Sequence, residues 1–333
     1  MNETFTLAHL SDLHLSSLNN VELRELLNKR IYGYLNWQVK RRAEHRREVL
    51  DALLHNLQHT TPDHIAVTGD LTHLGLPREF REARNVLQSL GSPSRVTVIP
   101  GNHDTYVSTD WNSTFALWTD YMLSDEAHLG ARAGTDGHTT FPSLRVRGIA
   151  ALIGVSTARP SAPFLAVGSV GQVQLQKLEK ILVETEKQRL FRVVLIHHPP
   201  VDGTVSWRKR LTDASAFRSV LDQHGVELIL HGHAHRSSLN HLETTAGTVP
   251  AIGVPSASAL GRTSSRRARY HLYRFKANPG GWEMVLTVMC YSPAQQAFTE
   301  EIEKHLLLPR SVGLSNPPPR LDSVPEGTTP HKR

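Results

Sequence analysis

The chain has 333 residues, of which 39% are hydrophobic and 20% charged, a composition typical of a globular protein that excludes a disordered or collagen-like chain. Its single cysteine, Cys290, excludes an intrachain disulfide, and no apolar run approaches the ~20 residues that span a bilayer. The net charge of +6 favours anionic partners such as nucleotides, nucleic acids or lipid headgroups. Residues 1–7 also lack the pattern of a secretory signal, so we expect a cytoplasmic protein.

Short apolar runs alternate along the chain with segments whose apolar residues are spaced three and four apart. The runs predict buried strands and the spaced segments predict amphipathic helices. In chain order they are the strand Phe5–Leu10, the helix Glu44–Leu57, the strand His64–Thr68, the helix Glu79–Leu90, the strand Arg95–Pro100, the helix Gln172–Leu182, the strand Arg192–Ile196, the helix Ala214–His224 and the strand Val226–Leu230. Further strands are predicted at Arg145–Val155, Val249–Val254, Tyr270–Phe275 and Trp282–Tyr291. This alternation predicts an α/β fold with several parallel strands.

Two segments depart from this alternation. Val21–Arg47 is predicted to be a helical insertion with a basic second half. Its predicted apolar face consists of Leu23, Leu27, Ile31, Tyr34 and Leu35, with Trp37 nearby. Such a helix either packs on its own domain, lies on an anionic membrane or shapes a pocket for an acyl chain. The second segment, Leu308–Arg333, is rich in Pro, Ser, Thr and Gly and predicts disorder. We therefore expect one domain over residues 1–308, with the insertion at about 18–47 and a flexible tail at 309–333.

Polar side chains of metal-binding type follow each of the five predicted parallel strands. They are Asp12, His14, Asp70, Asn102, His103, His197, His233 and His235. Ligands bind outside the carboxyl ends of the strands in open α/β sheets, and this donor set suits Mn, Fe, Zn or Co. The two-residue spacing of Asp12 and His14 predicts that both point to one face of an extended segment, and the same holds for His233 and His235. Each motif alone is typical of a turn or a solvated loop, but five in order predict a metal site.

The five motifs resemble, in this order, those of the calcineurin-like metallophosphoesterases. The resemblance covers Phe5 to His235 and rests on Asp12-Leu13-His14, Gly69-Asp70, Gly101-Asn102-His103, His197 and Gly232-His233-Ala234-His235. It implies a single-domain sandwich of two sheets flanked by helices. It also implies two metal ions and hydrolysis of a phosphate ester by a metal-bound hydroxide, without a covalent enzyme intermediate. The residues of the motifs are similar to those of the bacterial branch that includes cyclic-nucleotide phosphodiesterases and UDP-diacylglucosamine pyrophosphatase-type enzymes.

The family's residue roles can be carried over position by position. The resemblance implies that Asp12, His14 and His235 hold the first metal, that Asn102, His197 and His233 hold the second, and that Asp70 bridges the two. His197 is preferred over His198 because the family's ligand directly follows the strand. His103 is expected to be a proton donor to the leaving oxygen or a contact to the phosphate. Some relatives have an Asp that pairs with this histidine, at the position of His73 in this chain. Either His73 has another role, or Asp104 or another carboxylate orients His103.

Three residues are candidates for substrate contact. Tyr106 is expected to stack on a base or sugar, or to be an ordinary packing aromatic. Arg210, in the basic segment Trp207–Arg210, is a candidate for holding a second phosphate, and Arg159 is a similar candidate.

Three functions remain open from the sequence. The first is a phosphodiesterase or pyrophosphatase acting on a cyclic or nucleotide-linked substrate. The second is a membrane-facing pyrophosphatase of a lipid-linked UDP-sugar, located peripherally at the inner membrane face. The third is a non-catalytic metal-bearing scaffold or nucleic-acid-binding protein. No nucleic-acid-binding motif is found, so specific nucleic-acid binding is not expected. The sequence makes no prediction of the oligomeric state.

Overall fold

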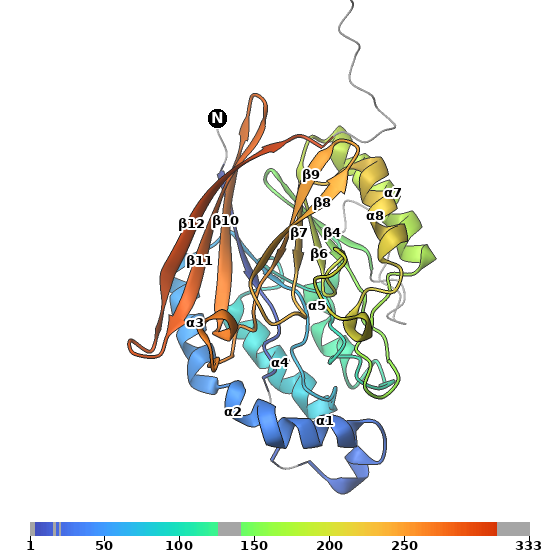
Figure 1. Cartoon of the computed structure of the whole chain (residues 1–333), viewed down its shortest axis with the longest axis vertical. Helices are drawn as coiled ribbons and strands as arrows, with labels where there is room; N and C mark the ends of the chain where they lie inside the picture. The colour runs from blue at the N-terminus through green and yellow to red at the C-terminus, as the bar shows by residue number, and fades with distance from the viewer. Residues whose placement is uncertain (1–3, 16–17, 20, 126–140, 312–333) are drawn as a thin grey trace, which may run out of the picture.

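The computed structural model describes residues 4–15, 18–19, 21–125 and 141–311. Within these ranges the strands form two mixed sheets of six strands each. Figure 1 shows the two sheets face to face, with helices on the outside of the sandwich. The α/β sandwich expected from the sequence is therefore confirmed.

The first sheet has the order β12-β11-β10-β1-β2-β3. Its strands are β1 (Thr4–Leu10), β2 (His64–Val67), β3 (Val96–Val98), β10 (Arg269–Asn278), β11 (Gly281–Ser292) and β12 (Ala297–Pro309). β1, β2 and β3 are parallel neighbours, whereas β10, β11 and β12 extend the sheet as an antiparallel meander. The parallel part is the half of the sheet whose strand ends carry the predicted motifs.

The second sheet has the order β4-β5-β6-β7-β9-β8. Its strands are β4 (Ser143–Arg147), β5 (Ala150–Val155), β6 (Phe191–Ile196), β7 (Leu228–His231), β8 (Ser238–Thr244) and β9 (Gly247–Gly253). The four central strands are parallel, and each edge strand pairs antiparallel with its neighbour. The carboxyl ends of β6 and β7 therefore lie at the same edge of this sheet.

Two apolar cores hold the sandwich together, and strand β5 shows how they are divided. Ala150 and Leu152 belong to the core between the sheets, whereas Ala151 and Ile153 belong to the core under the helices on the outer face. The outer helices of the second sheet are α7 (Gln172–Lys187) and α8 (Ala214–His224). The helices α3 (Arg47–Thr60), α4 (Pro77–Leu90) and the short α5 (Thr119–Met122) contribute to the core of the first sheet.

The structure corrects the predicted strands at three places. Residues 145–155 form the hairpin β4–β5 rather than one strand, because the chain reverses at Gly148 with a φ of 52°. The strands β8 and β12 were not predicted from the sequence. Both are edge strands, β8 mostly half-buried and β12 largely exposed, so they lack the continuous apolar pattern of the central strands. Cys290 lies buried in β11, as expected of a packed strand residue.

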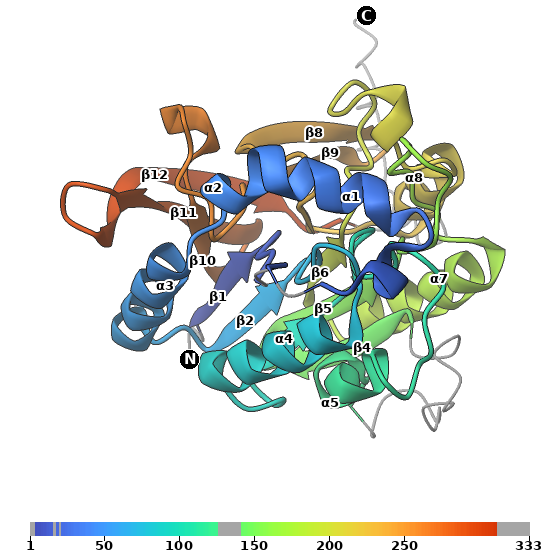
Figure 2. The same cartoon turned by 90° about the horizontal axis from the view of Figure 1, so that it is seen from below.

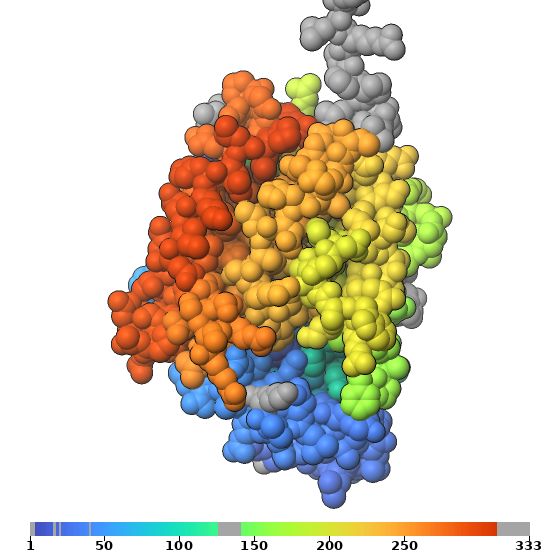
Figure 3. Space-filling view, viewed as in Figure 1, coloured from blue at the N-terminus to red at the C-terminus, as the bar shows by residue number. Residues whose placement is uncertain are grey.

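The predicted insertion is a succession of short helical pieces. They are a 3₁₀ helix at Leu23–Leu26, the α-helix α1 (Arg30–Asn36), a π-helical segment at Trp37–Arg41 and the short helix α2 (Arg42–Glu44). Figures 1 and 2 show α1 and α2 crossing the end of the sandwich toward which β1 and β2 run. Figure 3 shows the same segment closing that end of the molecule. No helix among the described residues is both long and apolar enough to cross a membrane.

The expected tail lies outside the described residues from residue 312 onward. Its first residues are described and belong to the folded part. β12 runs to Pro309, and the hydroxyl of Ser311 donates a hydrogen bond of 2.8 Å to the carbonyl of Val226.

Candidate metal centre

The predicted ligands meet at one end of the sandwich. Asp12 and His14 follow β1, Asp70 follows β2, and Asn102 follows β3. His197 follows β6 directly, whereas His233 and His235 follow β7. The two sheets thus supply donors from both sides of one site.

Ligand atoms of these residues fall into two clusters that share one carboxylate. The first cluster consists of Asp12, His14, Asp70 and His235, and the second of Asp70, His197 and His233. Within each cluster the potential ligand atoms lie within 4.8 Å of one another. The amide oxygen of Asn102 lies 3.2 Å from His197 Nε2, which adds an oxygen donor to the second cluster. The donors that the sequence predicted for two ions are therefore close enough to hold two.

The backbone brings these side chains together in a way that the sequence did not predict. Asp12, His14, Asp70, His233 and His235 all have positive φ angles, between 46° and 66°. The two predicted pairs are therefore not on extended segments, and strand alternation is the wrong reason for their convergence. Left-handed conformations are unfavourable for residues other than glycine. Strain of this kind gathers at functional sites, where the surrounding structure enforces it.

The carboxylates of this site fit a cation. Asp12 Oδ2 accepts the backbone N–H of His233 at 3.0 Å, and Asp70 Oδ1 accepts that of His103 at 2.7 Å. The other oxygen of each carboxylate is buried without a hydrogen bond among the described residues and faces an imidazole nitrogen, Asp12 Oδ1 at 3.1 Å from His235 Nε2 and Asp70 Oδ2 at 3.3 Å from His197 Nε2. A buried anionic oxygen without a partner is costly, and a metal ion removes that cost.

The imidazoles fit a cation as well. His14 Nδ1 donates to the carbonyl of Thr72 at 2.9 Å, and His197 Nδ1 donates to that of Thr68 at 2.6 Å. Such bonds fix the tautomer and leave Nε2 as the ligand atom, as in known metal sites. His197 Nε2 then faces Asp70 Oδ2 at 3.3 Å, so the two atoms require a proton or a metal ion between them.

His197 and His198 differ in the atoms that they have available. The Nδ1 of His198 is 2.7 Å from the hydroxyl of Thr157, and its Nε2 donates to the carbonyl of Ala166 at 3.1 Å. Both ring nitrogens of His198 are therefore engaged, whereas His197 has one directed at Asp70. The geometry favours His197, as the motif position did.

Charges in the site reinforce this pairing. Burial alone raises the pKa of Asp70, but the neighbouring imidazoles, His197 foremost, lower it well below its ordinary value. Burial lowers the pKa of His197, but the Asp70 carboxylate outweighs it and raises that pKa to about 9. Without metal the two groups therefore form a buried ion pair.

A backbone carbonyl, not a carboxylate, orients the ring of His103. His103 Nδ1 donates to the backbone carbonyl of His73 at 2.6 Å, which leaves Nε2 directed away from this bond. The side chain of His73 stacks on His14, with ring centroids 5.0 Å apart. Burial, and after it the charge of Arg41, lowers the pKa of His103 to about 3. A backbone carbonyl at position 73 thus holds the ring for which some relatives use a carboxylate.

The alternative that Asp104 orients His103 is wrong. Its carboxylate accepts the backbone N–H groups of Asp70, Thr72 and Gly101 at 2.8–2.9 Å. Asp104 therefore ties the loops after β2 and β3 together, and it has no part in holding the ring.

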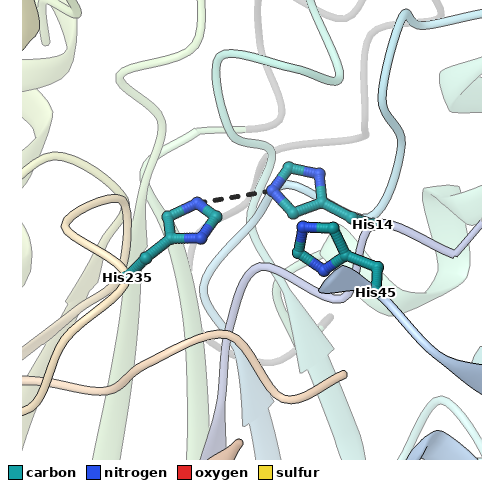
Figure 4. A group of neighbouring side chains, drawn as sticks. All are labelled: His14, His45 and His235. Atoms are coloured by element: carbon teal, nitrogen blue, oxygen red, sulfur yellow. Dashed lines mark hydrogen bonds between the residues drawn. The ribbon is translucent and has the colours of Figure 1, made fainter. Parts of the chain in front are cut away.

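Two residues of the insertion reach the site, and sequence reasoning did not single them out as site residues. His45 joins His14 and His235 in a third group of potential ligand atoms, and Figure 4 shows the three rings side by side. The ring centroids of His45 and His14 are 4.6 Å apart. The second residue, Arg41, lines the same cavity as Asp70 and His103. The one available signal was the departure of the insertion directly after His14.

The structure separates the three candidate substrate contacts. Tyr106 lines the cavity of about 480 Å³ beside the metal centre and stacks on His103, with ring centroids 5.5 Å apart. Arg210 donates to the carbonyl of Trp207, and Arg159 donates to the hydroxyl of Thr212. Neither arginine is among the described residues that line this cavity.

Other residues of the basic segment than Arg210 line this cavity. Arg208 and Lys209 of the short 3₁₀ helix Trp207–Lys209 line the cavity, and the next residue, Arg210, is exposed.

Comparisons with known proteins agree with this geometry. The family model of the calcineurin-like phosphoesterases matches residues 5–237. A probable cyclic nucleotide phosphodiesterase of Vesicomyosocius okutanii is 25% identical over 234 residues, which are 69% of this chain and 84% of that protein. The glycerophosphodiester phosphodiesterase GpdQ of Enterobacter lignolyticus is 34% identical over 98 residues, or 29% of each chain.

A solved structure shares the fold. It is a dimetal phosphatase from Danio rerio, with a TM-score of 0.52 and 15% identity, covering 90% of this chain and 98% of that chain. The family model covers more than half of the chain, and its span contains both clusters of potential ligands. This protein therefore belongs to the calcineurin-like phosphoesterase family and is a metal-dependent phosphoric ester hydrolase.

Proposed function

We propose that the protein hydrolyses a phosphodiester or pyrophosphate bond of a nucleotide-like substrate at a centre of two metal ions. Calcineurin-like phosphoesterases use two divalent ions. In the proposed arrangement Asp12, His14 and His235 hold one ion, and Asn102, His197 and His233 hold the other. The observation that carries the proposal is the pair of clusters that share Asp70, the proposed bridging ligand. Two bound ions supply a nucleophile at neutral pH and stabilise the attacking and leaving oxygens of the phosphate.

The chain's own residues then bind and orient the substrate. His103 is the proposed proton donor to the leaving oxygen, or a hydrogen-bond contact to the phosphate. As a donor it must carry a proton on both ring nitrogens, so the anionic phosphate has to raise its pKa from the value of about 3 that burial and Arg41 set in the free site. Its Nδ1–H is held by the carbonyl of His73, so its Nε2 is the atom that remains for the substrate. A ring fixed at one nitrogen needs little reorganisation when the substrate binds, which is what efficient proton transfer requires.

The nucleotide preference rests on the cavity and on the relatives. Tyr106 offers a half-buried aromatic ring beside His103, and Lys29 Nζ lies 4.4 Å from the centre of that ring. An aromatic face next to a phosphate site suits a base or a sugar. Three of the similar curated proteins carry the name probable cyclic nucleotide phosphodiesterase.

The experiment uses bis-p-nitrophenyl phosphate with the full chain loaded with manganese, beside a chelated sample and an Asp70→Asn variant. Removing the shared carboxylate weakens both sites, so we expect turnover to fall at least ~10³-fold and metal content by mass spectrometry to drop. Manganese, iron, zinc and cobalt are compared in the same assay. Undiminished hydrolysis by Asp70→Asn, or a wild-type protein that binds no metal, would refute the proposal.

A second proposal concerns location, and exposed apolar side chains on the insertion favour it. Leu23 and Leu27 are 83% and 82% exposed, and Ile31, Leu35 and Val39 are also exposed. Leu23, Leu27, Ile31 and Leu35 belong to the predicted apolar face, whereas Tyr34 of that face packs against the cluster around Leu26 and Trp37. Arg24 and Arg42 are exposed on the same segment. Apolar side chains with basic neighbours suit the surface of an anionic membrane. We propose that a cytoplasmic enzyme meets the inner membrane face here, as a substrate with a lipid part would require.

Vesicle co-sedimentation tests this second proposal. Leu23→Ser together with Leu27→Ser is expected to reduce binding to anionic vesicles several-fold while hydrolysis of bis-p-nitrophenyl phosphate stays unchanged. Val173→Ser, an exposed apolar residue of α7 on the outer face, is the matched control. Equal binding by the double variant and the wild type would refute membrane contact through this face.

A further inference from the structure

Arg41 occupies an unusual position for a basic residue of an insertion. It ends the π-helical segment Trp37–Arg41, and its Nη1 nitrogen is buried without a hydrogen-bond partner among the described residues. The next residue, Arg42, is exposed instead, with its guanidinium 5.9 Å from the ring of Trp37. The basic run of the insertion therefore has one arginine directed inward, so Arg41 is not available to a membrane surface.

The carboxylates that act on Arg41 belong to the metal centre. Burial lowers the pKa of Arg41, whereas the carboxylates of Asp70 and Asp12 raise it. These carboxylates are the proposed metal ligands, and bound cations neutralise them. With cations bound there, those two carboxylates would no longer balance the charge of Arg41, and its buried Nη1 without a hydrogen-bond partner calls for an anionic ligand.

Arg41 also lines two cavities. One is the cavity beside the metal centre, and the second has a volume of about 440 Å³. Both are lined by Arg41, Lys209 and His235. The second cavity is lined in addition by Arg262 and Arg266, and among its described lining residues Glu44 supplies the one carboxylate. We name it the cationic cavity, because four basic side chains surround it.

We propose that the cationic cavity is a subsite for a second phosphate of the substrate, with Arg41 as its principal contact. The metal centre takes the phosphate that is cleaved, and Arg41 lines both cavities. A planar guanidinium binds two oxygens of a phosphate at once, and Arg262 and Arg266 add positive charge around it. Within the proposed function, on which this inference rests, the subsite favours a pyrophosphate-linked substrate over a simple phosphodiester.

The test measures binding rather than turnover. Methylenediphosphonate, which carries two phosphonates, and methylphosphonate, which carries one, are titrated by calorimetry into the metal-loaded full chain. Arg41→Met is expected to weaken the binding of methylenediphosphonate about tenfold more than the binding of methylphosphonate. The double variant Arg262→Met and Arg266→Met is expected to weaken methylenediphosphonate binding in the same selective way, but less. Both side chains are exposed, so this variant should fold like the wild type. Arg42→Met is the matched control, with both affinities unchanged.

The outcomes separate this inference from the proposed function. Equal weakening of the two ligands by Arg41→Met would show that it contacts the cleaved phosphate alone, and no weakening by either variant would also overturn the subsite. Metal content, measured on each variant, excludes an indirect loss of ions. A wild-type protein that binds both ligands with the expected difference but hydrolyses no ester would refute the proposed function and leave the subsite standing.

Discussion

The strand-end loops of the sandwich and the insertion that covers them are built on opposite principles. The loops are buried and tightly constrained, so that a Cβ at Gly101 or Gly232 would overlap a carboxylate or hydroxyl of the site. The insertion is a chain of short irregular helices anchored by a few buried side chains such as Leu26 and Trp37. Reaction chemistry is therefore fixed by the part of the molecule that tolerates least change. Substrate and partner selection can vary in the part that tolerates most.

Among these predictions the largest effect is the loss of turnover when the strand-end loops lose the proposed proton donor. His103→Ala is predicted to lower turnover of bis-p-nitrophenyl phosphate by roughly 10²- to 10⁴-fold, the usual contribution of a positioned proton donor. Metal content should remain at the wild-type level, because His103 is not among the potential ligands of either cluster. The exposed His59→Ala provides the control. Loss of metal in His103→Ala would show that the residue belongs to the ligand set instead.

A smaller effect distinguishes the two faces of the insertion. Leu26 is 6% exposed and packs with Leu18, Trp37, Leu74 and Leu76, whereas its neighbour Leu27 is largely exposed. Leu26→Ala is predicted to lower the free energy of unfolding by about 2–3 kcal/mol, and Leu27→Ala by less than about 0.5 kcal/mol. Urea unfolding followed by circular dichroism measures both. Equal effects would mean that the insertion does not dock through Leu26.

The smallest effect concerns acid sensitivity of the sandwich. His64 on β2 contacts the Thr97 hydroxyl at 2.7 Å, and burial, followed by the charges of Arg147 and Arg145, lowers its pKa to about 3. The unfolded chain has the ordinary pKa of about 6.5 and binds more protons below that pH, so stability is present above pH 6.5 and is lost as pH falls toward 3. Between pH 7 and pH 5 the loss from this residue is on the order of 2 kcal/mol.

The substitution His64→Gln removes the titrating group and tests this origin. The free energy of unfolding of the chelated protein, measured in urea, should then fall less steeply from pH 7 to pH 5 in the variant than in the wild type. Exposed His305→Gln should leave the slope unchanged, since that side chain is solvated in both states. An unchanged slope in His64→Gln would assign the acid sensitivity to other buried histidines.

Much of the site could be predicted because its chemistry is local in the sequence. A buried parallel strand has a continuous apolar run, and ligands follow its carboxyl end, so Asp12, Asp70 and His197 could be found one strand at a time. The packing of two sheets and the left-handed turns that aim the donors have no such signature. Spacing alone thus gave a wrong reason for the pairing of Asp12 with His14.

The sequence by itself determined the central strands, the principal helices and the residues able to hold two metal ions. It did so because burial, periodicity and donor chemistry are properties of short segments. Tertiary structure alone decided that His73 holds His103 through a backbone carbonyl and that Arg41 turns inward beside an exposed Arg42. It also decided that the apolar stripe at Leu23 and Leu27 stays exposed. These facts depend on which face of an irregular insertion meets the sandwich, and contacts between distant segments set that choice.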